Sequence, residues 1–211
     1  MKGNLIIISS PSGGGKGTLI REVLKTVPSI GYSVSFTTRP IRDGELEGRD
    51  YFFVSPEEFE RRKVRGEFLE WARVHDNDYA TAKEGVREMT DQGNDVILEI
   101  DVQGAKNVLG QMPEAVSIFI LPPSYSVLEA RLTSRATENS GDLDVRLRNA
   151  PAEVQDYRSF AYVVVNEEVG TATQELCSII MSERLRPDRQ EERIKTILDS
   201  FDISNLSMSG E

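Results

Sequence analysis

Short apolar runs alternate with amphipathic stretches along most of this chain of 211 residues. The first run, Leu5–Ser9, is continuous and leads into a glycine-rich segment, a pattern typical of a buried strand in a parallel sheet. Between Thr18 and Val27 the apolar residues instead follow the spacing of one helix face. Further short apolar runs predict strands at Val96–Ile100, Val116–Leu121 and Tyr162–Val165. This alternation predicts an α/β fold in which helices flank a parallel sheet.

The segment 33–83 departs from that alternation. Apolar and aromatic runs there predict strands at Ser33–Thr38, Tyr51–Val54 and Phe68–Val74. Ser55 and Glu58 have the spacing of a capping box, and Pro56 stands in the first helical turn, which predicts one short helix. We interpret this segment as a small mixed α/β insertion.

A second departure covers residues 131–148, a charged stretch with four arginines and little apolar content. The predicted division of the chain is a core of residues 1–32, 84–130 and 149–211, the insertion at 33–83, and a separate arginine-rich segment at 131–148. Within the core, residues 203–211 are expected to form a frayed, disordered tail.

Charge and composition argue against several classes of function. The 35 acidic residues outnumber the 25 basic ones, and a net charge of −10 argues against a general binder of nucleic acid or anionic membranes. Any phosphate ligand must then be held by a local cluster of basic side chains and backbone N–H groups. The apolar runs are too short for a signal-peptide core or a membrane span, which favours a cytoplasmic protein.

The single cysteine and the single histidine give little basis for thiol or zinc chemistry. Cys177 cannot form a disulfide within the chain, and we expect it to be a buried small apolar residue in a reducing compartment. His75 has no cysteine or histidine neighbour, and we expect it at the surface or in a loop. We predict no metal ion bound by direct side-chain ligation.

A glycine-rich segment follows the first predicted strand and opens the first predicted helix. It reads Ser10-Pro11-Ser12-Gly13-Gly14-Gly15-Lys16-Gly17-Thr18. Glycines let backbone N–H groups turn toward a phosphate, a helix N-terminus adds positive potential, and Lys16 supplies a mobile charge. The strict G-x-x-x-x-G-K-[ST] pattern is not met, because Ser10 and Gly17 replace its first glycine and its Mg²⁺-binding hydroxyl residue. The alternative is a glycine-rich turn with a surface lysine.

Several longer motifs follow one another along the chain, at Val34–Arg42, Gly44–Phe53, Phe68–Ala72, Leu98–Gly104 and Phe119–Ser124. Together they resemble the guanylate kinases, a nucleoside-monophosphate kinase family of the P-loop superfamily. The resemblance extends from about Asn4 to Arg186 and includes the glycine-rich segment. It implies a P-loop kinase fold and transfer of the γ-phosphate of ATP to GMP, giving ADP and GDP in purine metabolism. It also implies that Mg²⁺ enters with ATP and is held mostly by nucleotide oxygens and water.

The resemblance also implies the site residues. The GMP phosphate would be held by Arg39, Arg42, Tyr51 and Tyr79, and guanine would be read by Glu70 with Ser35, Thr81 and Asp101. ATP would contact Ser12, Gly13, Gly14, Gly15, Lys16, Gly17, Thr18, Arg131, Arg135 and Asn166, the last on the adenine side. The residues that would act in catalysis are Lys16, Arg39, Arg131, Arg135 and Arg146, with residues 131–148 as a lid. Arginine forks suit phosphate oxygens, and a carboxylate suits the two adjacent donors of guanine.

Simpler interpretations exist for single residues. Arg39 and Arg42 could be solvated surface charges, and Glu70 could be an outward strand residue. Asp101 is expected on the same strand face as Glu99 by the period of two. The chain also departs from the family's usual residues at Asp76, Ala80, Glu99, Ala136 and Glu138.

Two other functions remain open at this point. One is a non-catalytic guanylate-kinase-like binding module, and the other is a kinase for a different small acceptor. A binding module can lose Lys16 and the lid arginines without harm to folding. The chain retains them, which favours the enzyme, with ATP and GMP as partners and no nucleic acid or membrane.

Overall fold

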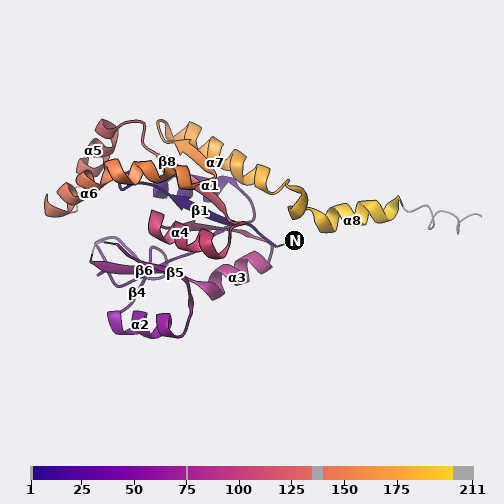
Figure 1. The fold of residues 1–211 in the computed structure, drawn as a ribbon, viewed down its shortest axis with the longest axis horizontal. Coiled ribbons are helices and arrows are strands. Elements are labelled where there is room, and N and C mark those ends of the chain that lie inside the picture. The colour runs from indigo at the N-terminus through magenta and orange to yellow at the C-terminus, as the bar shows by residue number, and fades with distance from the viewer. Residues whose placement is uncertain (1, 75, 135–139, 202–211) are drawn as a thin grey trace, which may run out of the picture.

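Two β-sheets organise the computed structural model, which describes residues 2–74, 76–134 and 140–201 (Figure 1). The larger sheet is parallel throughout, with the strand order β2-β7-β1-β8-β9. Its strands are β1 (Leu5–Ser9), β2 (Ile30–Tyr32), β7 (Asp95–Glu99), β8 (Val116–Leu121) and β9 (Tyr162–Val165). Because β1 lies between β7 and β8, the glycine-rich segment that follows β1 leaves the middle of the sheet.

Helices cover both faces of this sheet, which explains its uninterrupted apolar runs. The helices are α1 (Lys16–Thr26) and α7 (Val169–Glu183) on one face, and α3 (Lys83–Asp91) and α4 (Val102–Gln111) on the other. Ile6 and Ile8 pack toward α1 and α7, whereas Leu5 and Ile7 pack toward α3 and α4. Adjacent residues of β1 are therefore buried on opposite faces, and a polar residue at either position would lose its hydration.

The smaller sheet has the order β4-β3-β6-β5 and lies below the larger one in Figure 1. Its strands are β3 (Phe36–Thr37), β4 (Phe52–Phe53), β5 (Phe68–Val74) and β6 (Asn77–Ala82). Helix α2 (Pro56–Val64) covers it through Phe59, whose ring centroid lies 4.9 Å from that of Phe68. Ser55 caps α2 by accepting a bond from the Glu58 N–H at 3.2 Å. The Glu58 carboxylate accepts bonds from Arg61 and Arg62 rather than completing a capping box.

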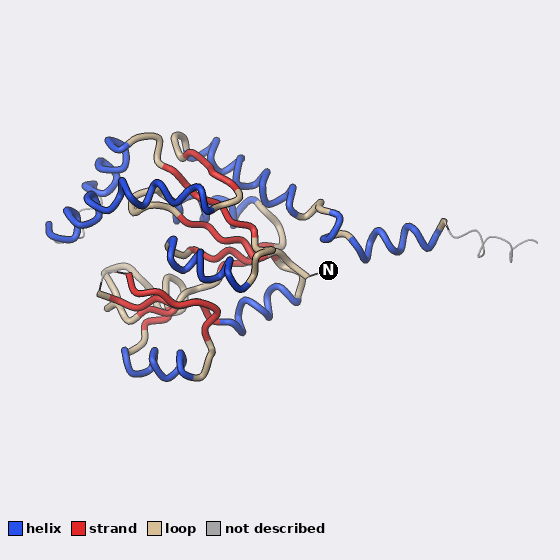
Figure 2. The backbone as a smooth tube through the Cα atoms, in the orientation of Figure 1, coloured by secondary structure: helices blue, strands red, loops and turns tan. Residues whose placement is uncertain are grey.

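Helices α5 (Tyr125–Ser134) and α6 (Ser140–Glu153) form an arm at one end of the larger sheet (Figure 1). They pack together through a separate apolar cluster made of Leu128, Leu132, Leu143, Leu147 and Ala150. The 3₁₀ helix η1 (Val154–Ser159) returns the chain from α6 to β9. Beyond α7, the 3₁₀ helix η2 (Pro187–Arg189) leads into α8 (Glu191–Ser200), which extends away from the body (Figure 2).

The predicted strands β1, β8, β9 and β5 have the expected bounds, and the other elements differ at their ends. β3 and β4 are shorter than predicted, and β7 spans Asp95–Glu99 rather than Val96–Ile100. Helix α1 begins at Lys16 rather than Thr18, because Gly15 supplies a left-handed N-cap. Cys177 is half-buried rather than fully buried and packs against the core, while His75 and residues 203–211 lie outside the described residues.

Strands β2 and β6 were not predicted. β2 lies at the edge of its sheet, contains a glycine and is only three residues long. β6 is mostly polar, and it becomes a strand because it pairs with β3 and β5 on its two sides. None of the helices in the described ranges combines the length and apolar character needed to cross a membrane.

Candidate active site

The phosphate loop, residues 10–18, connects β1 to α1. Gly15 has a φ of 87° and Gly13 has a φ of 83°, a left-handed backbone that favours glycine. Neighbouring elements also approach both residues closely. A Cβ atom on Gly15 would stand 2.4 Å from Asn166 Nδ2, and one on Gly13 would stand 2.9 Å from Leu132 Cγ. The glycines therefore permit both the turn and the contacts, and they place a helix N-terminus at the loop.

Asn166 and Arg131 support the loop from its side. Asn166 Nδ2 donates to the Gly14 carbonyl oxygen at 2.9 Å, and Arg131 Nη2 donates to the Asn166 carbonyl oxygen at 2.9 Å. Arg131 Nη1 lies 3.7 Å from the position of a Cβ atom on Gly15. This nitrogen and Asn166 Oδ1 are buried without a hydrogen-bond partner in the described part of the chain. An unsatisfied guanidinium donor beside a phosphate loop fits a phosphate oxygen.

Helix α6 carries two further residues to consider, and one of them contacts the loop. Arg146 is half-buried on α6. Glu153, the last residue of α6, accepts a bond from the Ser12 N–H at 3.0 Å. Arg135, together with Ala136 and Glu138, lies outside the described residues.

Lys16 faces an acidic residue at the end of β7. Its Nζ lies 3.8 Å from Glu99 Oε1, and Tyr32 donates its hydroxyl proton to Glu99 Oε2 at 3.2 Å. A Cβ atom on Gly17 would lie 3.6 Å from Glu99 Oε1, so this carboxylate stands beside the loop position that lacks a hydroxyl. Thr18, the next hydroxyl residue, accepts a bond from Arg21 at 3.2 Å. Burial, with the charge of Glu99, raises the pKa of Tyr32 and keeps its phenol protonated.

Arg39 lies at the centre of an aromatic and acidic cluster on the smaller sheet. The residue is 9% exposed, and its Nη2 donates to Glu45 Oε1 at 2.7 Å. The guanidinium carbon lies 5.3 Å from the Tyr51 ring centroid, and the Tyr51 and Tyr79 rings are 5.8 Å apart. The Arg42 backbone N–H donates to Glu45 Oε2 at 2.8 Å. The structure thus brings together Arg39, Arg42, Tyr51 and Tyr79, the residues predicted to hold the GMP phosphate. The Glu45 carboxylate is the anion bound there in this structure.

The charges of this cluster support each other. Burial disfavours the charged forms of Arg39 and Glu45, but their mutual ion pair outweighs it, raising the pKa of Arg39 and lowering that of Glu45. Burial, followed by the charge of Glu99, raises the pKa of Tyr51. The charge of Glu99 therefore acts on Tyr51 of this cluster, while its carboxylate lies 3.8 Å from the Lys16 ammonium of the phosphate loop.

Glu70 lies in a separate buried position on β5. It is 5% exposed, and the Thr81 hydroxyl donates to its Oε1 at 2.7 Å. Its Oε2 lies 2.8 Å from the position of a Cβ atom on Gly104, so glycine leaves room for the carboxylate. Burial raises the pKa of Glu70 to about 7. The charge of Asp101 also raises this pKa, whereas the hydrogen bond from Thr81 lowers it.

The remaining predicted base residues have different positions. Ser35 is buried in the link between β2 and β3. Asp101 does not share a strand face with Glu99, because β7 ends at Glu99 and Asp101 is the N-cap of α4. Its Oδ1 accepts a bond from the Gly104 N–H at 2.9 Å. Its charge still acts on Glu70, so the two carboxylates are neighbours by tertiary contact.

Three contacts of the site were not predicted from sequence: those of Tyr32, Glu45 and Glu153. Glu45 lies six residues after Arg39, and its charge within that arginine-containing motif was an available signal. Tyr32 and Glu153 contact residues 67 and 141 positions away, and nothing in their local sequence indicates this.

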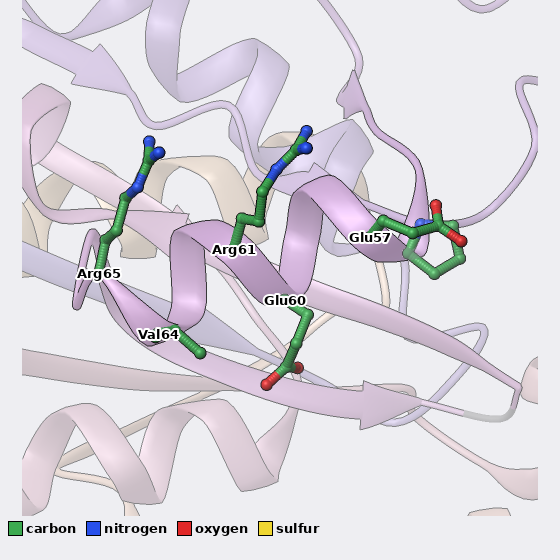
Figure 3. A pocket seen from close by; sticks show the side chains of 6 residues that line it. Glu57, Glu60, Arg61, Val64 and Arg65 are labelled. Atoms are coloured by element: carbon green, nitrogen blue, oxygen red, sulfur yellow. The ribbon is translucent and has the colours of Figure 1, made fainter.

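A hollow of about 620 Å³ lies on the outer surface of α2 (Figure 3). It is lined by Pro56, Glu57, Glu60, Arg61, Val64 and Arg65. Arg61 and Arg65 extend to one side of the helix and Glu60 to the other. None of the predicted site residues that the structure describes lines this hollow, so it is separate from their positions.

Comparison with known proteins places this arrangement in a family. The guanylate kinase family model matches residues 2–183. The chain belongs to the guanylate kinase family. The guanylate kinase of Symbiobacterium thermophilum is 47% identical over 199 residues, covering 94% of each chain. That of Thermotoga maritima is 46% identical over 195 residues, covering 92% of this chain and 94% of its own.

A solved structure of the guanylate kinase family agrees with the fold. The crystal structure of guanylate kinase from Anaplasma phagocytophilum has a TM-score of 0.76 and 35% identity, and the match covers 89% of each chain. The family, the kinase class and the α/β fold with a flanked parallel sheet, all predicted from the sequence, are confirmed.

Proposed function

We propose that this member of the guanylate kinase family transfers the γ-phosphate of ATP to GMP through the residues described above. The observation that carries the proposal is the cluster of buried Arg39 with half-buried Tyr51 and Tyr79, an anion site separate from the phosphate loop. Glu99 lies 3.8 Å from Lys16 Nζ, and its charge also acts on Tyr51 of that cluster. A kinase that transfers a phosphoryl group from one phosphorylated substrate to another needs two anion sites that face one another.

The donor side is supported by the phosphate loop and its neighbours. Backbone N–H groups at the start of α1 and the Lys16 ammonium would hold the ATP phosphates. Arg131 Nη1, buried without a partner in the described part of the chain, would bind a phosphate oxygen. Arg146 and Arg135 would complete the charge neutralisation from the lid.

The acceptor side requires an exchange of partners. Arg39 now binds Glu45, and the doubly charged GMP phosphate would replace that carboxylate on the guanidinium fork. Tyr51 and Tyr79 would add neutral donors, because the raised pKa of Tyr51 keeps its proton in place. The attacking atom is already a phosphate oxyanion, so transfer needs positioning and charge neutralisation rather than a strong general base.

Guanine recognition would rest on ionised Glu70, which can accept bonds from the N1–H and the amino group of guanine. The Thr81 hydroxyl has a single proton, and it donates this proton in its hydrogen bond to Glu70 Oε1. While that bond persists Thr81 cannot donate to the guanine O6, so its role is to orient Glu70. Ser35 remains the candidate donor to O6.

The residues near the phosphate loop fit a magnesium ion bound with ATP. Mg²⁺ prefers oxygen ligands and retains much of its water, and it neutralises phosphate charge when bound. Gly17 offers no hydroxyl, but the Glu99 carboxylate lies beside it and would hold the hydrated ion. Side-chain contact through water agrees with our prediction of no direct ligation, which stays a prediction.

The activity can be tested by measuring ADP formation from ATP with GMP, AMP, CMP or UMP offered separately. We expect ADP to form rapidly with GMP and at background rates with the others. Turnover with a different monophosphate alone would assign another acceptor. Binding of GMP without ADP formation would indicate a non-catalytic module.

The raised pKa of Glu70 predicts that GMP binding weakens in mild acid. With a folded pKa of about 7, Glu70 is mostly protonated at pH 6 and mostly ionised at pH 8. Because only the ionised form accepts both guanine bonds, the dissociation constant for GMP should be about tenfold higher at pH 6 than at pH 8. Calorimetry in buffers of different ionisation enthalpy should detect a proton released on binding at pH 6.

Glu70→Gln is the control for this pH dependence, because it leaves the titration of the GMP phosphate itself unchanged. Dividing the wild-type affinity by that of the variant isolates the Glu70 contribution. A ratio that stays constant from pH 6 to pH 8 would contradict the prediction.

A further inference from the structure

Glu153 places a carboxylate against the phosphate loop although the proposed ligand of that loop is itself an anion. Its Oε2 accepts a bond from the Ser12 N–H at 3.0 Å, across 141 residues of sequence. The contact is partly buried. A bond from a backbone N–H to an ionised acceptor is stronger than one between neutral groups, so this contact ties the end of α6 firmly to the loop.

The position of Glu153 in α6 links the loop to a lid arginine. Arg146 and Glu153 are seven residues apart, which is two helical turns, and they therefore lie on the same face of α6. Leu143, Leu147 and Ala150 pack α6 against α5 along the adjoining side of the helix. The side of α6 that carries Arg146 is thus held near the loop at the Glu153 end.

The chain changes its geometry at Glu153. Helix α6 ends there, and the 3₁₀ helix η1 starts at Val154. Pro151, in the last turn of α6, has no N–H to donate within the helix. Both features weaken the regular helical hydrogen bonding at the base of the arm, where a fixed contact has the greatest effect on the direction of α6.

We propose that Glu153 is a positioning residue for phosphoryl transfer, which sets the place of Arg146 by anchoring the base of α6 to the Ser12 N–H. The proposal rests on the proposed function, because Arg146 is assumed to act on the transferred phosphate. Glu153 itself touches neither substrate. Its contribution is to fix the phosphate loop and the base of α6 to each other. Arg146 is then already positioned for the phosphate when the substrates bind.

Steady-state kinetics with ATP and GMP test this assignment. We expect Glu153→Ala to lower kcat at least tenfold with little change in the KM for GMP, because Glu70, Thr81 and the Arg39 cluster lie on or beside the smaller sheet. Glu153→Gln keeps an acceptor oxygen for the Ser12 N–H and should recover most of the rate. Glu129→Gln, an exposed carboxylate on α5, is the matched control and should behave as wild type.

A double-mutant cycle with Arg146→Ala separates positioning from general damage to the structure. If Glu153 acts through Arg146, adding Glu153→Ala to Arg146→Ala should lower kcat by less than twofold. Independent effects that multiply would overturn the proposal, as would an unchanged kcat in Glu153→Ala. A lower KM for ATP with normal kcat would also overturn it, since Glu153 would then be a competing anion. Wild-type protein that forms no GDP would refute the proposed function, and this inference with it.

Discussion

Replacing Lys16 with methionine is expected to lower kcat for GDP formation roughly 10³-fold or more. Methionine keeps an unbranched apolar side chain but removes the ammonium charge. The Lys16 Nζ now lies 3.8 Å from Glu99 Oε1, and without it the Glu99 carboxylate would repel the phosphates of both nucleotides. Transfer would then proceed with uncompensated charge where the donor and acceptor phosphates meet. A coupled assay of ADP formation under saturating ATP and GMP measures this loss.

The same variant should still bind GMP, because the Arg39 cluster and Glu70 belong to the smaller sheet. Calorimetric titration with GMP checks that separation. Lys25→Met is the matched control, since Lys25 is an exposed lysine on the same helix, paired with Glu22 at 2.8 Å. We expect it to have wild-type turnover. Near-normal turnover in Lys16→Met would remove the phosphate-loop assignment.

At pH 8, where Glu70 is mostly ionised, wild-type protein is expected to prefer GMP over AMP by roughly 10⁴-fold in kcat/KM, and Glu70→Gln should reduce this preference sharply. Adenine presents a lone pair at N1 and a hydrogen at C2, where guanine presents two donors. An ionised Glu70 would face adenine with its charge unpaired in a buried place, since the side chain is only 5% exposed. The comparison requires kcat/KM for GMP, IMP and AMP with both proteins.

IMP serves as an intermediate substrate for comparison with GMP and AMP. It keeps the N1–H and O6 of guanine but lacks the amino group, so its kcat/KM should fall between those of GMP and AMP. Glutamine at position 70 keeps an acceptor for the Thr81 hydroxyl but places donors beside Asp101 and against the donor groups of guanine. The variant should therefore lose activity with GMP far more than with AMP.

Glu60→Gln on α2 removes the same charge from an exposed position and should leave the preference unchanged. A wild-type preference for GMP over AMP of less than about tenfold, or about 1.4 kcal/mol, would remove Glu70 from its proposed role. The arginine and tyrosine contacts to the phosphate would then dominate binding.

Local patterns determined those parts of the protein whose conformation depends on neighbours in the chain. The apolar runs of β1, β8 and β9 were predicted with the observed bounds, because strands buried on both faces must be apolar at every position. The phosphate loop was equally visible, since its glycines, lysine and following helix are contiguous. The family resemblance named the residues around Arg39 and Glu70, whereas each residue taken alone left a simpler alternative open: a solvated surface charge for Arg39 and an outward strand residue for Glu70.

Tertiary structure decided the features that depend on groups brought together from distant parts of the chain. The polar strand β6 forms because β3 and β5 pair with it, and Asp101 caps a helix instead of extending β7. The bond from Ser12 to Glu153 has no local signature. The raised pKa of Glu70 has the same origin, because burial by the surrounding elements and the charge of Asp101 produce it. Backbone conformation follows from adjacent residues, but desolvation and charge pairing follow from the folded neighbourhood, which a linear pattern does not contain.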